Sequence, residues 1–322
     1  MKLLVTVPWD PEQLQQVKAQ FPQVIFCSAT TAAAVLAEIV DAEVVFGDFS
    51  REAFLAAKEL RWVQCHGAGV NKLVAIPELL ASSVQITSTK GAHAPTIAEH
   101  FFGLLISLAR RFPQLQAAQQ QKSWVPWTEW SAKIGAHPIA LQGRTLGVIG
   151  LGKIGRAIAV RAQAFEMKVI AVDLLEMEKP SYVDQLGQLE HLSSLLQSSD
   201  VVVVAVPGTP ATAHLLDADR LGELRRDAIL IVVSRGGIVD ETALCALLRD
   251  GHLAGAALDV TEQEPPPADS PLWNTPNLLL TPHIAGKSTN TTAAATEIFA
   301  ENLARYLAQQ PLQNLVDKLL GF

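Results

Sequence analysis

The stretch TLGVIGLGKIGRAIA, residues 145–159, carries three glycines in the pattern GxGxxG. It begins as an apolar run and continues as an Ala-rich segment, which predicts a strand, a tight turn and the start of a helix. Gly150 would permit the turn, Gly152 would let a pyrophosphate approach the backbone, and Gly155 would let the helix pack on the strand. Because helix N-termini bind phosphate groups, the stretch predicts a dinucleotide-binding domain.

A second run, KVIAVD, ends in Asp173, 18 residues after Gly155. An acid about 20 residues beyond the glycines binds the ribose hydroxyls of the cofactor and would repel a 2′-phosphate. Leu174 and Leu175 follow it, where an NADP-binding protein often has arginine. The sequence therefore favours NAD over NADP. The alternative is that the glycines only form a turn and Asp173 is a polar strand end, but all these features stand in register.

Short apolar runs alternate with helix-like segments along most of the chain, which predicts βαβ units and parallel sheets. With 322 residues, the chain is long enough for two α/β domains. Pro95 opens a long helix pattern that ends at Arg110 and Arg111, and Ser288 is expected to cap a final helix. The predicted strands are LLVTV, VIFCS, EVVFG, WVQCH and VQITST, then TLGVIG, KVIAVD, DVVVVAVP, AILIVVS, LAGAALDV and NLLLTPH.

Composition narrows the functional class. The formal net charge of −7 disfavours nucleic-acid and membrane-surface partners. No apolar run approaches the roughly 20 residues that span a bilayer, and the N-terminus reads as a first strand rather than a signal peptide. Cys27, Cys65 and Cys245 show neither zinc-ligand spacing nor a disulfide framework. We therefore expect a cytoplasmic protein without a metal site.

Three motifs place reactive side chains just after predicted strands, where open parallel sheets bind ligands. Arg235 follows ILIVVS, Asp259 and Glu264 follow the apolar run LAGAAL, and His283 follows NLLLTP. Reduction of a keto acid needs such groups: an imidazolium to protonate the carbonyl oxygen, a carboxylate to orient the ring, and an arginine to hold the substrate. Taken separately, Arg235 could be a surface charge, Glu264 a residue of a Pro-rich loop and His283 a spacer.

With these motifs, the chain resembles the D-isomer-specific 2-hydroxyacid dehydrogenases. The matching pieces are GVIGLGKIGRAIA, SRGGIVDETAL, LDVTEQEP and NLLLTPHIAG, and the resemblance extends to HGAGV and TIAEH in the first domain. It implies a Rossmann domain over residues 99–287 and a flavodoxin-like substrate domain over 1–98 and 288–322, to which the final helix returns. It also implies an oxidoreductase that interconverts 2-keto and D-2-hydroxy acids with NAD(H) and forms a homodimer.

The resemblance also implies residue roles. Arg235 would bind and polarise the substrate, and His283, paired with Glu264, would be the general acid or base. Gly67, Ala68 and Gly69 would hold the substrate carboxylate through backbone N–H groups, in a nest that needs glycine. Besides the three glycines and Asp173, the cofactor would contact Lys153, Ile154, Val206, Pro207, Val233, Ser234, Asp259 and Gly286.

Some features leave alternatives open. Val232 and Asn71 stand where the family often has Asn and Asp. Trp124, Trp127 and Trp130 could line the substrate site, pack between subunits or only cover the surface. A hydroxypyruvate or glyoxylate reductase is an alternative, as is a phosphoglycerate dehydrogenase, although HGAGVNKL offers Lys72 as its only cation. A corepressor-like NAD(H)-sensing scaffold would show the same catalytic residues. The particular 2-hydroxy acid, the physiological direction and the pathway stay open.

Overall fold

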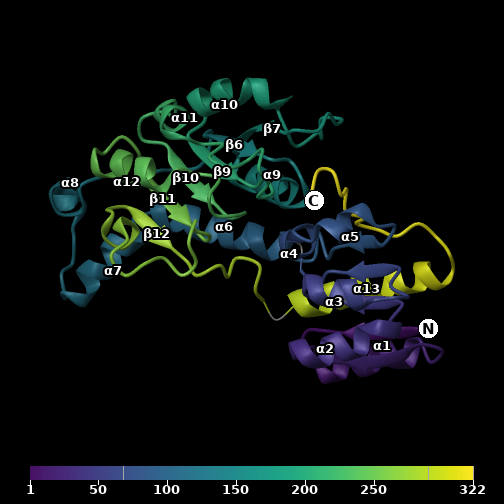
Figure 1. Ribbon diagram of the computed structural model, residues 1–322. Coiled ribbons are helices and arrows are strands. Elements are labelled where there is room, and N and C mark those ends of the chain that lie inside the picture. The colour runs from purple at the N-terminus through teal and green to yellow at the C-terminus, as the bar shows by residue number, and fades with distance from the viewer. Residues whose placement is uncertain (68, 289, 322) are drawn as a thin grey trace. The chain divides into compact units, whose positions relative to one another are not determined.

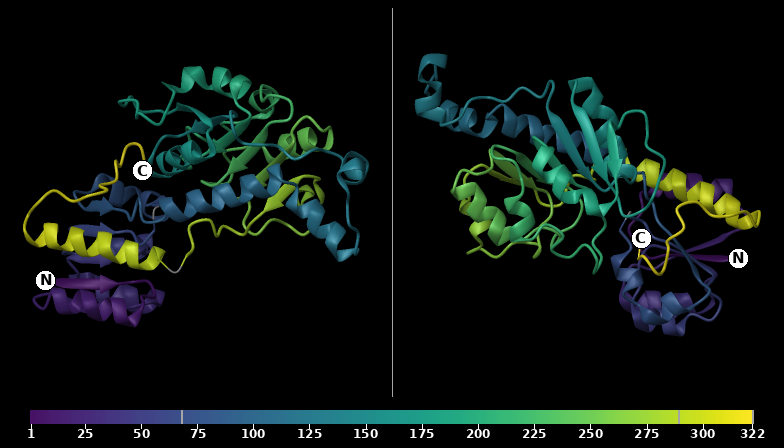
Figure 2. Two further views of the ribbon diagram at one scale, coloured as in Figure 1. Left: turned by 180° about the vertical axis from the view of Figure 1, so that it is seen from behind. Right: turned by 90° about the horizontal axis from the view of Figure 1, so that it is seen from above.

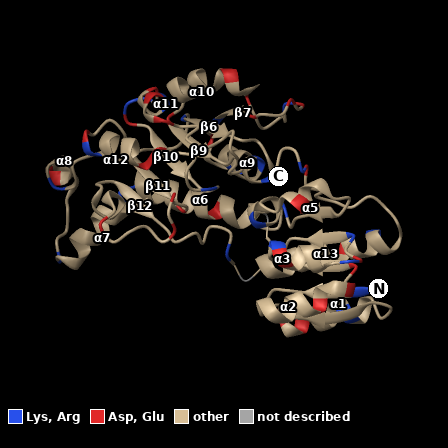
Figure 3. Ribbon diagram, in the orientation of Figure 1, with Lys and Arg blue, Asp and Glu red and all other residues tan. Residues whose placement is uncertain are grey.

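The computed structural model describes residues 1–67, 69–288 and 290–321, which form two compact units. One contains residues 1–93 and 287–322, and the other residues 94–286. The domain boundaries expected from the sequence fall after residues 98 and 287, whereas the two units of the structure divide after residues 93 and 286. No helix among the described residues combines the length and apolar character needed to cross a membrane. Figure 3 shows acidic and basic residues interspersed on both units.

The first unit is built on a five-stranded parallel sheet in the order β2-β1-β3-β4-β5, which is the flavodoxin-like order. The prediction of a flavodoxin-like domain is thus confirmed. The elements of this unit, several of them labelled in Figure 1, are β1 (Lys2–Val5), α1 (Pro11–Gln20), β2 (Ile25–Ser28), α2 (Ala32–Glu38), η1 (Ile39–Asp41), β3 (Val44–Phe46), α3 (Arg51–Ala56), β4 (Trp62–Gln64), α4 (Asn71–Val74), α5 (Pro77–Ala81), β5 (Gln85–Thr87) and α13 (Thr291–Leu307).

Both faces of this sheet are buried, which explains why its strands read as continuous apolar runs. Leu4 points to the face covered by α2 to α5, whereas Leu3 and Val5 point to the face covered by α1 and α13. The α13 helix is fixed to the second face by Phe299, a fully buried residue that packs among Trp9, Phe46 and Trp62. Residues from both ends of the chain therefore share one core.

The second unit contains a seven-stranded parallel sheet in the order β12-β11-β10-β9-β6-β7-β8. Read from β6, this is the doubly wound Rossmann order with one strand added at the edge. The predicted two-domain α/β class with a Rossmann domain is confirmed. Its elements are α6 (Ala94–Ala109), α7 (Phe112–Gln120), η2 (Trp127–Glu129), α8 (Trp130–Ile134), β6 (Thr145–Ile149), α9 (Lys153–Ala162), η3 (Gln163–Phe165), β7 (Lys168–Val172), β8 (Gln185–Gly187), η4 (Leu189–His191), α10 (Leu192–Ser198), β9 (Val201–Val204), α11 (Ala218–Gly222), β10 (Ile229–Val232), α12 (Glu241–Arg249), β11 (Gly255–Leu258), η5 (Pro271–Asn274) and β12 (Leu278–Leu280).

The seven-stranded sheet separates two hydrophobic cores. Leu146 and Val148 pack with α6 and α9 on one face. On the other face, Ile149 of β6 and Val202 and Val204 of β9 pack with α10, α11 and α12. The α7 and α8 helices lie apart from both cores and extend from the rest of this unit (Figures 1 and 2).

Three local expectations need correction. The edge strand β8 was not predicted, because its three residues, QLG, contain no apolar run. The final helix begins after Asn290, which makes no side-chain cap, while the Ser288 hydroxyl lies 2.7 Å from that of Thr291. The long helix ends at Ala109, and Arg111 adopts a left-handed backbone and donates to the carbonyl of Ala254 from a buried position.

Candidate active site

The glycine loop joins β6 to α9 at the point where the strand order of the sheet reverses. Gly150 has a φ of +94°, and a Cβ on Gly155 would lie 2.0 Å from the carbonyl oxygen of Gly150. Both glycines are therefore required by the turn itself. A Cβ on Gly152, in contrast, would meet no atom within 4 Å. The space beside Gly152, at the N-terminus of a ten-residue helix, fits the approach of a pyrophosphate.

Asp173 follows β7 and faces the same loop. Its carboxylate accepts hydrogen bonds from the backbone N–H groups of Leu151, at 2.6 Å, and Leu175, at 2.9 Å. The acid and the glycine loop are thus joined directly, as expected for a site that holds a ribose next to a pyrophosphate.

The other predicted cofactor contacts lie on this unit. Val206 is buried against Gly150, and Pro207 next to it is exposed. Lys153 is exposed and Ile154 half-buried in the first turn of α9, and Gly286 is half-buried at the end of the unit. Val233 and Ser234 are buried after β10. Ser234 Oγ has no hydrogen-bond partner among the described residues, so a cofactor bound here would give this hydroxyl its partner.

His283 and Glu264 form the central pair. His283 Nδ1 lies 2.8 Å from Glu264 Oε2, and both side chains are about half exposed, at 47% and 41%. The second carboxylate oxygen of Glu264 accepts from the backbone N–H of Thr261. The bond at Nδ1 leaves Nε2 as the ring nitrogen that can exchange a proton with a ligand.

Asp259 shapes the loop that carries His283. It is 2% exposed and accepts hydrogen bonds from the Thr281 hydroxyl and from the backbone N–H groups of Ile284 and Ala285. Its own carbonyl accepts from the backbone N–H of His283, which has a φ of +53°. The Asp259 carboxylate therefore has several partners within the protein, and the expectation that it also holds the cofactor stays a prediction.

Arg235 is half-buried after β10, and its Nη1 donates to the carbonyl of Ser234 at 2.7 Å. Next to it, a Cβ on Gly236 would lie 1.9 Å from the carbonyl oxygen of Thr261. Only glycine allows this approach, and the approach brings the Arg235 turn against the loop that holds Glu264. The first glycine of SRGG, Gly236, therefore indicates this close approach in the sequence, where it was not predicted.

Further supporting residues were not predicted for this site. His100 on α6 lies 3.0 Å from the Thr281 hydroxyl and 3.6 Å from Asp259. Glu241, at the start of α12, accepts from the backbone N–H of Glu262, and burial raises the pKa of its carboxyl. A hydroxyl directly after β12 was the only sequence signal for Thr281.

The first unit carries the predicted substrate loop after β4. The Gly67 carbonyl accepts from Thr89 N–H, and the Gly69 carbonyl lies 3.3 Å from the Cys65 thiol. Gly67 does not have a positive φ, and a Cβ there would meet nothing closer than 4.0 Å, so a left-handed backbone does not explain this glycine. The predicted role of Ala68 falls on a residue outside those that the structure describes.

Two titratable groups in this loop are perturbed. Burial raises the pKa of the Cys65 thiol to about 12, and the nearby Asp48 carboxylate acts in the same direction. Partial desolvation lowers the pKa of the His66 imidazole; Asp48 opposes this shift, and Lys287 and Lys72 add to it. At neutral pH, Cys65 is therefore a thiol and His66 is mostly the neutral base.

Comparison with known proteins agrees with this geometry. Residues 102–285 match the family model of the D-isomer specific 2-hydroxyacid dehydrogenase, NAD binding domain. A glyoxylate reductase of Korarchaeum cryptofilum is 34% identical over 96% of this chain and 89% of that protein. A D-3-phosphoglycerate dehydrogenase of Archaeoglobus fulgidus is 31% identical over 98% of this chain and 59% of its own length.

Among solved structures, a D-isomer specific 2-hydroxyacid dehydrogenase from Xanthobacter autotrophicus, in complex with NADPH and MES, has a TM-score of 0.85 at 31% identity. It covers 100% of this chain and 99% of its own. The chain belongs to the D-isomer specific 2-hydroxyacid dehydrogenase family. It is an oxidoreductase that acts on CH–OH groups with NAD(P).

The second and third glycines of the loop, Gly152 and Gly155, are expected to separate cofactor binding from stability. We expect Gly152→Ala to leave the thermal midpoint unchanged and to weaken NADH binding at least about tenfold, or about 1.4 kcal/mol, because its methyl group occupies the pyrophosphate space. Gly155→Ala should lower the thermal midpoint as well, because its methyl group meets the Gly150 carbonyl. Calorimetry and NADH fluorescence titration measure both. Unchanged NADH affinity in Gly152→Ala would contradict the assignment.

Proposed function

We propose that the protein reduces a small 2-keto acid to the D-2-hydroxy acid with NADH, with glyoxylate and hydroxypyruvate as the first candidate substrates. The observation that carries the proposal is the hydrogen bond between His283 and Glu264 at the carboxyl edge of a Rossmann sheet. The similarity to a glyoxylate reductase over nearly the whole chain supports the substrate class.

In this proposal, His283 donates a proton from Nε2 to the substrate carbonyl oxygen, while Glu264 holds Nδ1 and stabilises the protonated ring. The Arg235 guanidinium binds the substrate carboxylate and polarises the carbonyl. The nicotinamide, when bound, supplies the hydride that reaches the carbonyl carbon. In sum, keto acid, NADH and one proton give hydroxy acid and NAD⁺, and the reverse direction uses His283 as the base.

Substitution of His283 tests the chemistry. We expect His283→Ala to lower kcat for glyoxylate or hydroxypyruvate about 10²- to 10⁴-fold, because no proton donor remains, with NADH affinity kept within about twofold. Glu264→Gln should lower kcat less, since the amide still holds the ring but carries no charge. His191→Ala, a substitution of an exposed histidine on η4, is the matched control.

Two alternatives correspond to other outcomes of this assay. Strong preference for a phosphorylated 3-carbon hydroxy acid would favour a phosphoglycerate dehydrogenase, which the single Lys72 of the substrate loop does not support. Tight NADH binding by the unaltered protein without turnover of any 2-keto acid would contradict the reductase proposal. It would favour the NAD(H)-sensing scaffold instead.

We further propose that the cofactor is NAD rather than NADP. Asp173 carries a negative charge beside the glycine loop and exposed Leu174 and Leu175 follow it. The alternative is NADP, because the relative from Xanthobacter autotrophicus was solved in complex with NADPH.

The cofactor assignment is tested by the ratio of kcat/KM with NADH to that with NADPH. We expect a ratio of at least about ten in the unaltered protein, because a 2′-phosphate would be repelled by Asp173. Asp173→Ser should reduce the ratio about tenfold by removing that charge. Glu176→Gln removes a charge three residues further along and serves as control. A preference of the unaltered protein for NADPH would overturn the assignment.

We also propose a homodimer held by the segment from α7 to α8. Three of its large apolar side chains are exposed: Trp124 is 91% exposed, Trp127 65% and Phe112 50%. The Trp127 ring contacts those of Trp130 and His137 at tilted angles of 40° and 48°, so the segment has its own local packing. Exposed apolar surface of this kind is typical of a protein–protein interface. A cytoplasmic location is a separate part of the proposed function.

Sedimentation velocity tests the homodimer. We expect the unaltered protein to sediment as a dimer at micromolar concentration. Trp124→Ser with Trp127→Ser should shift it toward monomer, because the apolar contact is lost. Trp273→Ser removes a comparably exposed tryptophan elsewhere in the same unit and should leave the dimer intact. A monomeric unaltered protein would contradict the proposal.

A further inference from the structure

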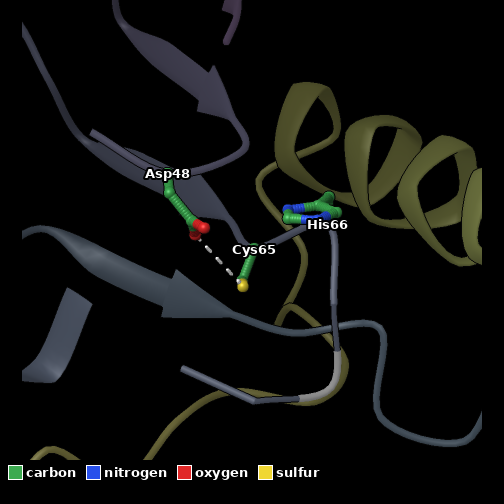
Figure 4. Close-up of side chains that lie close together, drawn as sticks. All are labelled: Asp48, Cys65 and His66. Carbon is green, nitrogen blue, oxygen red and sulfur yellow. Dashed lines mark hydrogen bonds between the residues drawn. The ribbon is translucent and has the colours of Figure 1, made fainter. Parts of the chain in front are cut away.

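Asp48, Cys65 and His66 form the only group of three possible metal ligands among the residues that the structure describes. Their ligand atoms all lie within 4.8 Å of one another, and Figure 4 shows the three side chains gathered in one place. They follow β3 and β4, which are neighbouring parallel strands. Cys and Asp are 17 positions apart, so the search for paired cysteine spacing in the sequence could not find this group.

The backbone fixes the positions of two of these residues. Gly47 has a φ of +123° and a Cβ there would lie 2.2 Å from Thr6 Oγ1, so only glycine makes the turn that presents Asp48. Cys65 continues the strand pairing, since its N–H donates to the carbonyl of Thr87 at 2.8 Å. The Cys65 thiol, 1% exposed, lies 3.6 Å from Asp48 Oδ1.

The distances and the donor types fit zinc. Tetrahedral zinc with bonds of about 2.0 to 2.3 Å separates its ligand atoms by about 3.4 to 3.6 Å. The Cys65–Asp48 pair already has that spacing, and a ring nitrogen of His66 lies within 4.8 Å of both ligand atoms. One sulfur, one imidazole nitrogen and one carboxylate oxygen suit this borderline-soft cation better than magnesium or calcium.

The charges around the group set the strength of such a site. A thiolate and the Asp48 carboxylate together neutralise a divalent cation. Lys72 and Lys287 act electrostatically on His66, and they would repel the free cation. We therefore expect micromolar rather than nanomolar affinity.

We propose that Asp48, Cys65 and His66 bind one zinc ion, with water as the fourth ligand, and that this zinc inhibits the enzyme. On binding, a Zn–S bond forms and the thiol proton leaves to solvent. Because Cys65 and His66 lead directly into Gly67 and Gly69, bound zinc would fix the loop that we expect to receive the substrate carboxylate. The inhibitory part rests on the proposed reductase function, whereas the binding part does not.

Metal binding is measured first, without any substrate. Competition with a chromogenic zinc chelator should show one ion per chain at micromolar affinity. Cobalt(II) added in place of zinc should give a thiolate-to-metal charge-transfer band. Cys65→Ser should abolish the band and weaken zinc at least about tenfold, because the thiolate is the strongest ligand. Cys27→Ser, a substitution of the half-buried cysteine on β2, should change neither result.

His66→Asn guards against a folding defect in Cys65→Ser, since His66 is exposed and its loss should also weaken zinc. Zinc affinity that is unchanged in both variants, or absent from the unaltered protein at micromolar zinc, would overturn the site. Where zinc binds in the unaltered protein, it should raise the KM for glyoxylate, and Cys65→Ser should remove this effect. Zinc binding in a protein without reductase activity would reject the proposed function while leaving the site standing.

Discussion

The buried carboxylate of Asp259 is the interaction on which the candidate active site depends. A carboxylate that is 2% exposed is costly unless hydrogen bonds compensate it, and here one hydroxyl and two backbone N–H groups do so. All three donors lie between residues 281 and 285, so the requirement to satisfy one buried charge dictates the path of the chain after β12. His283 is held inside that path, with a left-handed backbone, where its ring meets Glu264.

Glycine provides the second constraint, because it lets backbones meet where side chains would collide. The close approach of Gly155 to Gly150 shapes the cofactor loop, and that of Gly236 to Thr261 joins the Arg235 turn to the Glu264 loop. In both places a single methyl group would separate segments that carry the proposed chemistry. The sheet supplies the common edge, and the glycines determine how closely the loops on that edge can pack.

The sequence could predict the sheets because parallel strands buried on both faces leave continuous apolar runs. β8 escaped prediction because Leu186, its one apolar residue, stands between a glutamine and a glycine, and the strand is defined only by its pairing with β7. The pairing of His283 with Glu264 followed from motifs with known order, and the geometry brings the two side chains together. The Asp259 network and the approach of Asp48 to Cys65 depend on three-dimensional contacts between distant segments, for which no local pattern exists.

The placement of α13 also affects the order in which the chain can fold during synthesis. Phe299 fills the core beside Trp62, and the buried Asn302 donates to Gln64, 238 positions earlier in the chain. The five-stranded sheet therefore lacks part of one core until the ribosome has made α13. The seven-stranded unit is continuous in sequence and complete by residue 286, so it can fold first. Strands β1 to β5 precede that unit in the sequence, so part of an apolar face stays exposed until α13 is made, which favours aggregation in the meantime.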